Sequence, residues 1–256
     1  MEITRVAVPV SRAPMGGTNV YLLGADSIAL VDPATRAAEL DRLLADRSVD
    51  HLLVTHTHPD HVGGVATYAD ETGATVWARA GHTDRFHATT GVDPDRTFTP
   101  GTTIDLDGDR LRILDAPGHT SDHVALEAGA GGPILCGDCA IETGSVAVGA
   151  PDGDMRAYLT TLRRLRAIDP PTLCPGHGPL ITTPRETLDR LFAHRADREQ
   201  RVLAAVDDGR ETLDEILDAA YDRELAGVEG LARATVRAHL EKLAVEGHVQ
   251  WDGDWI

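Results

Sequence analysis

The chain has 256 residues, 42% of them hydrophobic, which is enough for one large globular domain and a small second one. Its formal net charge of −17 opposes non-specific binding to nucleic acid or to anionic lipid. No apolar run approaches the length of about 18 residues that a membrane span needs, and no export signal opens the chain. We therefore expect a cytoplasmic protein with no membrane partner.

Short apolar runs bounded by turn residues predict strands in the first part of the chain, at 20–24, 28–33, 51–55 and 74–78. The first two form a hairpin, and the third runs directly into the sequence HTHPDH. A helix is predicted near 64–72. The stretch 81–100 has no clear period, and we expect it to line the substrate site.

The second part repeats this pattern, with strands predicted at 102–106, 110–117, 124–129, 132–138 and 172–178. A helix with one apolar stripe is predicted at 154–168. Two strand-rich halves separated by helices are typical of an α/β sandwich.

Three helices and a turn follow. Threonine, proline and glutamate at 183–186 predict a helix start, and Thr212 with Glu215 forms a second capping box. A third helix is predicted at 229–247, before a hairpin turn at Asp252 and Gly253. This order predicts a winged helix. We place the catalytic domain at 1–194 and the winged-helix domain at 195–256, with the boundary inside a continuous helix.

Seven residues that suit a divalent metal ion each follow an apolar run, most of them beside glycine or proline: His56, His58, Asp60, His61, His119, Asp138 and His177. Histidines in surface loops are the alternative interpretation, but seven such residues at strand ends argue against it. The first four lie within six positions, where a loop can direct two side chains to one point and two to another.

The pattern H-x-H-x-D-H, followed by a later His, Asp and His, resembles the metallo-β-lactamase superfamily over residues 15–180. The resemblance implies a four-layered αββα sandwich. It also implies one metal ion on His56, His58 and His119, a second ion on Asp60, His61 and His177, and Asp138 between them. It further implies that Asp32 orients a ligand histidine and that His123 has a structural role.

Asp138 stands where β-lactamases of this superfamily usually have cysteine, so the resemblance favours its other hydrolases and nucleases. It implies two divalent ions, zinc first, with manganese or iron also compatible. A hydroxide bridging the ions would attack an ester, thioester or phosphodiester, with Asp60 and Asp138 as catalytic carboxylates.

The sequence HRADREQ, from His194 to Gln200, resembles a branch that includes single-strand endoribonucleases and glyoxalase-like hydrolases, although a solvated, salt-bridged helix face is the alternative interpretation. From residue 195 onward, 8 basic residues face 15 acidic ones, which opposes RNA binding. Three hypotheses remain: a hydrolase of small esters or thioesters, a single-stranded RNA endonuclease, and a metal-binding regulator that binds DNA. Relatives in the family often form homodimers, and we allow for one here.

Overall fold

The computed structural model describes residues 1–11, 13–106, 108–221, 225 and 227–253. The described chain divides into two compact units built from interleaved segments. The first comprises 1–116, 122–142 and 170–184, and the second comprises 117–121, 143–169 and 185–256. Within the described residues, no helix is both long and apolar enough to cross a membrane.

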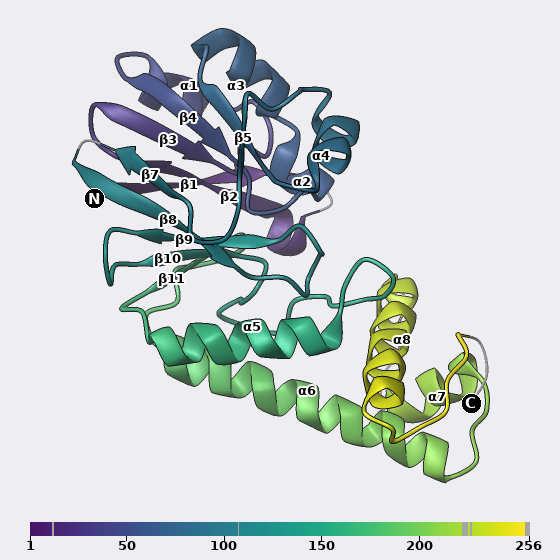
Figure 1. The fold of residues 1–256 in the computed structure, drawn as a ribbon. Coiled ribbons are helices and arrows are strands. Elements are labelled where there is room, and N and C mark those ends of the chain that lie inside the picture. The colour runs from purple at the N-terminus through teal and green to yellow at the C-terminus, as the bar shows by residue number, and fades with distance from the viewer. Residues whose placement is uncertain (12, 107, 222–224, 226, 254–256) are drawn as a thin grey trace. The chain divides into compact units, whose positions relative to one another are not determined.

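The first unit contains two mixed sheets (Figure 1). The six strands of the first sheet lie in chain order: β1 (Ile3–Pro9), β2 (Gly17–Leu23), β3 (Ser27–Val31), β4 (Ser48–Leu53), β5 (Thr75–Arg79) and β6 (Arg96–Phe98). The second sheet has the order β11-β10-β9-β8-β7: Leu173–Pro175, Ile134–Gly137, Val124–Ala128, Asp109–Asp115 and Thr103–Leu106. The predicted hairpin is confirmed as the antiparallel pair β2 and β3.

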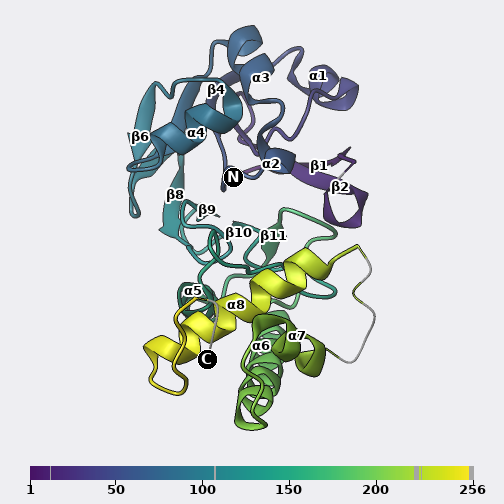
Figure 2. The ribbon, with the colours of Figure 1, turned by 90° about the vertical axis from the view of Figure 1, so that its right-hand side faces the viewer.

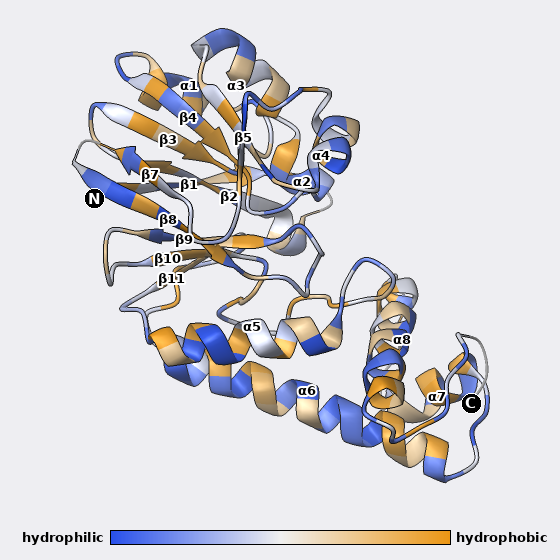
Figure 3. Cartoon of the chain, in the orientation of Figure 1, coloured by the Kyte–Doolittle hydropathy of each residue, from blue (hydrophilic) through white to orange (hydrophobic). Residues whose placement is uncertain are grey.

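Buried side chains of the first sheet alternate between two cores. Leu22 and Leu30 pack in a cluster with residues of the helices α1 (Ala38–Leu44), α2 (Pro59–Val62), α3 (Val65–Thr72) and α4 (Thr83–Thr90). Their neighbours Leu23 and Val31 pack instead with Leu126 and other residues of the second sheet. Strands that are buried on both faces read as continuous apolar runs, which is why this part of the sequence shows no alternation (Figure 3).

Helices α1, α3 and α4 lie on one side of the first sheet (Figure 2). The sequence did not predict α4, β6 or β1. Phe86 is the one residue of α4 that is buried, so the helix has no apolar stripe that a pattern could reveal. Three of the predicted layers, one of helices and two of sheets, are therefore present within the first unit.

The described residues of the second unit form four helices: α5 (Met155–Ile168), α6 (Pro184–Asp207), α7 (Leu213–Ala220) and α8 (Glu229–Val245). The capping box of Thr212 and Glu215 is confirmed, and α6 is continuous across residue 194. An apolar cluster joins the end of α6 to α7 and α8. Between residue 185 and Gly253 the described residues contain no strand, and the second arm of the predicted wing falls outside them. The winged helix therefore stays a prediction.

Candidate metal centre

The HTHPDH segment leaves β4 beside the end of β3. These strands are parallel, with Val31 opposite Leu53, so Asp32 and the residues after β4 emerge at the same edge of the sheet. Pro59 occupies the first position of α2, and His58 precedes it in an extended conformation. His58 therefore stands before the helix while Asp60 and His61 stand on its first turn, which divides the segment as the sequence predicted.

A second pair of parallel strands forms the opposite edge of the site. Gly137 of β10 is opposite Pro175 of β11, and the amide of Gly176 donates to the carbonyl of Gly137 at 2.9 Å. Asp138 and His177 follow directly. Asn19 of β2 links this edge to the first sheet, because its side-chain amide donates to the carbonyl of Pro175 at 2.8 Å.

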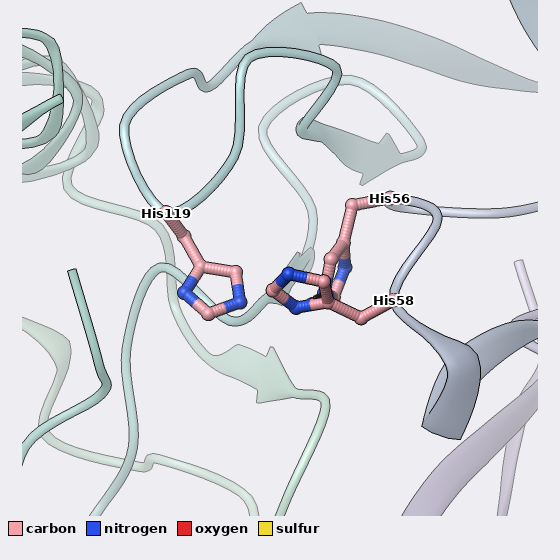
Figure 4. A group of neighbouring side chains, drawn as sticks. All are labelled: His56, His58 and His119. Carbon is pink, nitrogen blue, oxygen red and sulfur yellow. Dashed lines mark hydrogen bonds between the residues drawn. The ribbon is translucent and has the colours of Figure 1, made fainter. Parts of the chain in front are cut away.

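All seven residues predicted as ligands occur in groups whose possible ligand atoms lie within 4.8 Å of one another. The three groups are His56, His58 and His119 (Figure 4); His56, His61 and Asp138; and Asp60, His61 and His177. The two groups that contain His61 lie wholly in the first unit. Within the described residues, these groups contain none of the following histidines, which lie elsewhere in the sequence: His51, His82, His87, His194, His239 and His248.

Short distances connect the last two groups. The Nε2 atoms of His61 and His177 are 3.3 Å apart. One oxygen of Asp138 lies 3.6 Å from His61 Nε2, and the other lies 3.4 Å from His177 Nε2. Asp60 approaches His177 Nε2 to 3.5 Å. The side chain of Asp60 is 19% exposed and that of Asp138 is 9% exposed, so Asp60 offers the more accessible carboxylate of the two.

Asp32 sets the orientation of His61. Its Oδ2 lies 3.1 Å from His61 Nδ1 and accepts from the hydroxyl of Thr55 at 2.8 Å, while its Oδ1 accepts from the amide of Thr55 at 2.6 Å. A carboxylate accepts hydrogen bonds, so the proton of His61 lies on Nδ1 and its lone pair on Nε2. The hydroxyl of Thr55 uses its hydrogen in the bond to Asp32, so its oxygen accepts a hydrogen bond from His56 Nδ1 at 3.1 Å.

Backbone carbonyls orient the other two rings in the same way. His177 Nδ1 donates to the carbonyl of Gly17 at 2.9 Å, and His119 Nδ1 donates to the carbonyl of Ala147 at 2.6 Å. Each bond places the lone pair on Nε2. Four imidazole rings are thus held with Nε2 as the acceptor atom, which is the form that binds a metal ion.

The electrostatics of the site also favour a cation. Burial alone lowers the pKa of His61, but the charge of Asp138, the hydrogen bond that His61 donates to Asp32, and the charges of Asp32 and Asp60 raise it to about 9. Burial also lowers the pKa of His177, and the hydrogen bond and charge of Asp138 raise it above its ordinary value. Carboxylates and oriented imidazoles at these distances are the donor set of zinc and similar ions, so the residues present fit divalent metal ions.

Two glycines lie so close to the site that neither position has room for a side chain. A Cβ at Gly176 would lie 2.5 Å from Asp138 Oδ1 and 2.7 Å from His61 Cε1. Gly137 has a φ of +47°, and a Cβ there would lie 2.7 Å from both His123 Nε2 and Thr55 Oγ1. The glycines of the CGD and PGH sequences are therefore steric requirements of the site.

His123 lies beneath the ligands. Its Nε2 accepts from the amide of Asp138 at 3.0 Å, and its ring stacks on that of His56 with centroids 4.9 Å apart. These contacts agree with the structural role that the resemblance implied.

Other supporting residues were not predicted from the sequence. Buried Asp122 accepts from the amide and hydroxyl of Thr57, at 3.0 and 2.7 Å, and Arg85 donates to the same hydroxyl at 2.7 Å. These hydrogen bonds fix Thr57, the second residue of HTHPDH. A polar run such as GHTSDH, with an aspartate beside His123, was the available signal for Asp122.

Comparisons with known proteins show the family of this chain. Residues 13–177 match the model of the metallo-beta-lactamase superfamily. A beta-lactamase-like protein 2 homolog of Drosophila melanogaster is 30% identical over 257 residues, covering 94% of this chain and 86% of the relative. A hydroxyacylglutathione hydrolase of Acidiphilium cryptum is 32% identical over 210 residues, covering 80% of each.

Two further relatives extend over nearly the whole chain. An atrochrysone carboxyl ACP thioesterase of Paecilomyces divaricatus is 26% identical over 252 residues, covering 91% of this chain and 76% of the relative. The crystal structure of a metallo-beta-lactamase family protein from Thermus thermophilus is similar with a TM-score of 0.79 and 28% identity, covering 99% of this chain and 97% of that one. The chain therefore belongs to the metallo-β-lactamase superfamily and is one of its hydrolases.

Proposed function

We propose that this protein is a dinuclear metal-dependent hydrolase of acyl thioesters and esters. The observation that carries the proposal is the set of oriented ligands: His56, His61, His119 and His177 each have Nδ1 engaged by a carbonyl, carboxylate or hydroxyl. A structural site would need one tetrahedral set of four ligands, whereas here seven ligand residues fall into overlapping groups.

We assign one ion to His56, His58 and His119 and the other to Asp60, His61 and His177. Asp138 would be shared, because its two oxygens approach different histidines, Oδ1 to His61 and Oδ2 to His177. Zinc is our first expectation, and manganese or iron also suits nitrogen and oxygen ligands. Divalent ions there would polarise the substrate carbonyl and make water more acidic.

Side chains of the protein would accept the hydrogen bond of the attacking water and limit the access of solvent. Asp60 is the more exposed carboxylate, so it can accept a hydrogen bond from the attacking water. As the water oxygen bonds to the acyl carbon, the carbon–sulfur bond breaks and the thiolate leaves, taking up a proton. Asp138 is 9% exposed and His61 is fully buried, so bulk water has little access beneath the reacting atoms.

The thioester class is supported by two relatives, one named as a hydroxyacylglutathione hydrolase and one as an acyl carrier protein thioesterase. The charge of residues 195–256, with 8 basic against 15 acidic residues, continues to oppose an RNA substrate. We therefore place thioesters first and keep single-stranded RNA as a second substrate for the test.

The test compares wild-type protein with His58→Ala and with Asp70→Asn, a change of an exposed residue on α3. Each is stripped with a chelator, reloaded with zinc, manganese or iron(II), and given an acyl thioester probe with a thiol-reactive dye. We expect thiol release by wild type and Asp70→Asn, its loss on chelation, its return with metal, and no release by His58→Ala. If fully loaded wild type releases no thiol and instead cuts labelled single-stranded RNA, the thioester proposal is wrong.

A further inference from the structure

Arg198 and Glu199 of the HRADREQ motif connect α6 to other parts of the second unit, while Asp197 and Gln200 are exposed. Arg198 donates to the carbonyl of Ala220, and its guanidinium lies 3.5 Å from the ring centroid of Tyr221. Glu199 accepts from Lys242 Nζ at 2.6 Å and lies 3.2 Å from His239 Nδ1. Arg198 and Glu199 are therefore partly buried, and the ion pair of Glu199 with Lys242 is of the kind that a salt-bridged helix face predicts. None of these contacts, however, reaches a ligand of the metal centre.

Arg195 differs from them in its burial and in its target. Although it is charged, the residue is 3% exposed. Its Nη2 donates to the carbonyl of Val146, and its guanidinium lies 5.4 Å from the ring centroid of Tyr158 on α5. Burying a guanidinium costs stability unless it is hydrogen-bonded. The bond to the Val146 carbonyl therefore offsets part of the cost of burying Arg195.

Val146 belongs to a segment, residues 144–150, that has no helix or strand of its own. Backbone groups in such a segment need partners from elsewhere. Arg190 donates to the carbonyl of Gly144, and the amide of Ala150 donates to the carbonyl of Ala234 at 3.0 Å. Two arginines of α6 and one turn of α8 thus hold the segment in place.

The carbonyl next to Val146 is the one that orients His119. Ala147 accepts from His119 Nδ1 at 2.6 Å, which selects the ring form whose lone pair lies on Nε2. The loop that carries His119 is fixed separately: its Gly118 carbonyl accepts from the amide of Asp154 at 2.9 Å. The backbone of the histidine and the orientation of its ring therefore depend on different contacts.

We propose, resting on the metal role assigned to His119, that Arg195 is a positioning residue for the metal centre. By holding the Val146 carbonyl it fixes the adjacent Ala147 carbonyl, which in turn fixes the tautomer and direction of the His119 ring. Without that bond, residues 144–150 can shift, and the His119 ring can rotate or exchange its proton between nitrogens. Supporting residues of this kind typically contribute about 10–100-fold to metal affinity.

The experiment compares Arg195→Met and Arg195→Lys with Arg198→Met, the matched loss of an arginine three positions along the same helix. Cobalt(II) or zinc affinity is measured by competition with a chromogenic chelator, and thermal unfolding is measured on the metal-free chains. The tautomer of His119 is read from the ¹⁵N shifts of its ring in the metal-free protein, with His119→Ala used to assign the signal.

We expect Arg195→Met to weaken binding of one of the two ions by about 10–100-fold and to give a mixture of His119 tautomers. Arg195→Lys keeps a donor and should recover part of the affinity, which keeps the test valid if the methionine variant unfolds. Arg198→Met should lose thermal stability with metal affinity within about twofold of wild type. Wild-type affinity and a single tautomer in both Arg195 variants would overturn this proposal. Failure of wild type to bind any metal would instead overturn the proposed function.

Discussion

Asp32→Asn isolates the orientation of one ligand without changing the shape of the site. Asp32 is 1% exposed and accepts three hydrogen bonds, from the amide and hydroxyl of Thr55 and from His61 Nδ1. In asparagine the carbonyl oxygen must keep facing the Thr55 amide, because an NH₂ group there would oppose another donor. The new NH₂ then faces Thr55 Oγ1 and His61 Nδ1.

The hydroxyl of Thr55 can turn to accept from the new NH₂ group, but the ring of His61 can accept only by moving its proton to Nε2. That tautomer directs an N–H at the metal position in place of a lone pair. Contacts of this kind contribute about 10–100-fold to metal affinity, or about 1.4–2.8 kcal/mol at 1.4 kcal/mol per tenfold change. The charge-assisted bonds to Asp32 also contribute to stability, at about 1.5–3 kcal/mol for one such bond.

We therefore expect Asp32→Asn to stay folded, to bind zinc about 10–100-fold more weakly than wild type, and to unfold about 5–10 °C lower in the metal-free state. Chelator competition gives the affinity, and thermal melts of the metal-free chain give the stability. Asp70→Asn on the exposed face of α3 is the control and should change neither. Wild-type zinc affinity in folded Asp32→Asn would refute the assignment of the His61 tautomer.

Three further changes test other parts of the structure. Gly176→Ala places a Cβ 2.5 Å from Asp138 Oδ1. Zinc affinity in a competition assay should therefore fall more than tenfold while the circular dichroism spectrum stays native. Unchanged zinc affinity would contradict this geometry. Thr212→Ala removes the cap of α7 and should lower the free energy of unfolding in urea by about 1 kcal/mol, with Thr212→Ser close to wild type. Burial, and then the charge of Arg195, lowers the pKa of His194 from 6.5 to about 4. Between these values the unfolded chain binds a proton that the folded chain does not, so stability should fall from pH 6.5 to pH 4, and fall less in His194→Asn.

The sequence predicted the parts of the site that local patterns encode. HTHPDH follows an apolar run, and Asp138 and His177 each follow another, so a rule about strand ends was enough to bring them together. The capping box at Thr212 and the start of α6 at Pro184 were equally local. In these cases the residues that determine the structure are neighbours in the chain.

The contacts that hold the ligands were not predictable in this way. Asp122 bonds to Thr57 across 65 positions of sequence, and His177 bonds to Gly17 across 160. Helix α4 was missed because its one buried residue, Phe86, makes no periodic pattern. Such features depend on where the folded backbone passes, which composition and spacing do not specify.

Arg195 shows why the second kind of contact matters for function. The sequence HRADREQ is equally compatible with a solvated helix face, since its charges carry no sign of burial. Only the folded chain shows that Arg195 is enclosed, that its target is a carbonyl, and that the next carbonyl orients His119. A metal ligand can be recognised from its own residue type and position. The groups that determine its tautomer are often backbone atoms, and these are specified by whichever distant side chain holds that backbone in place.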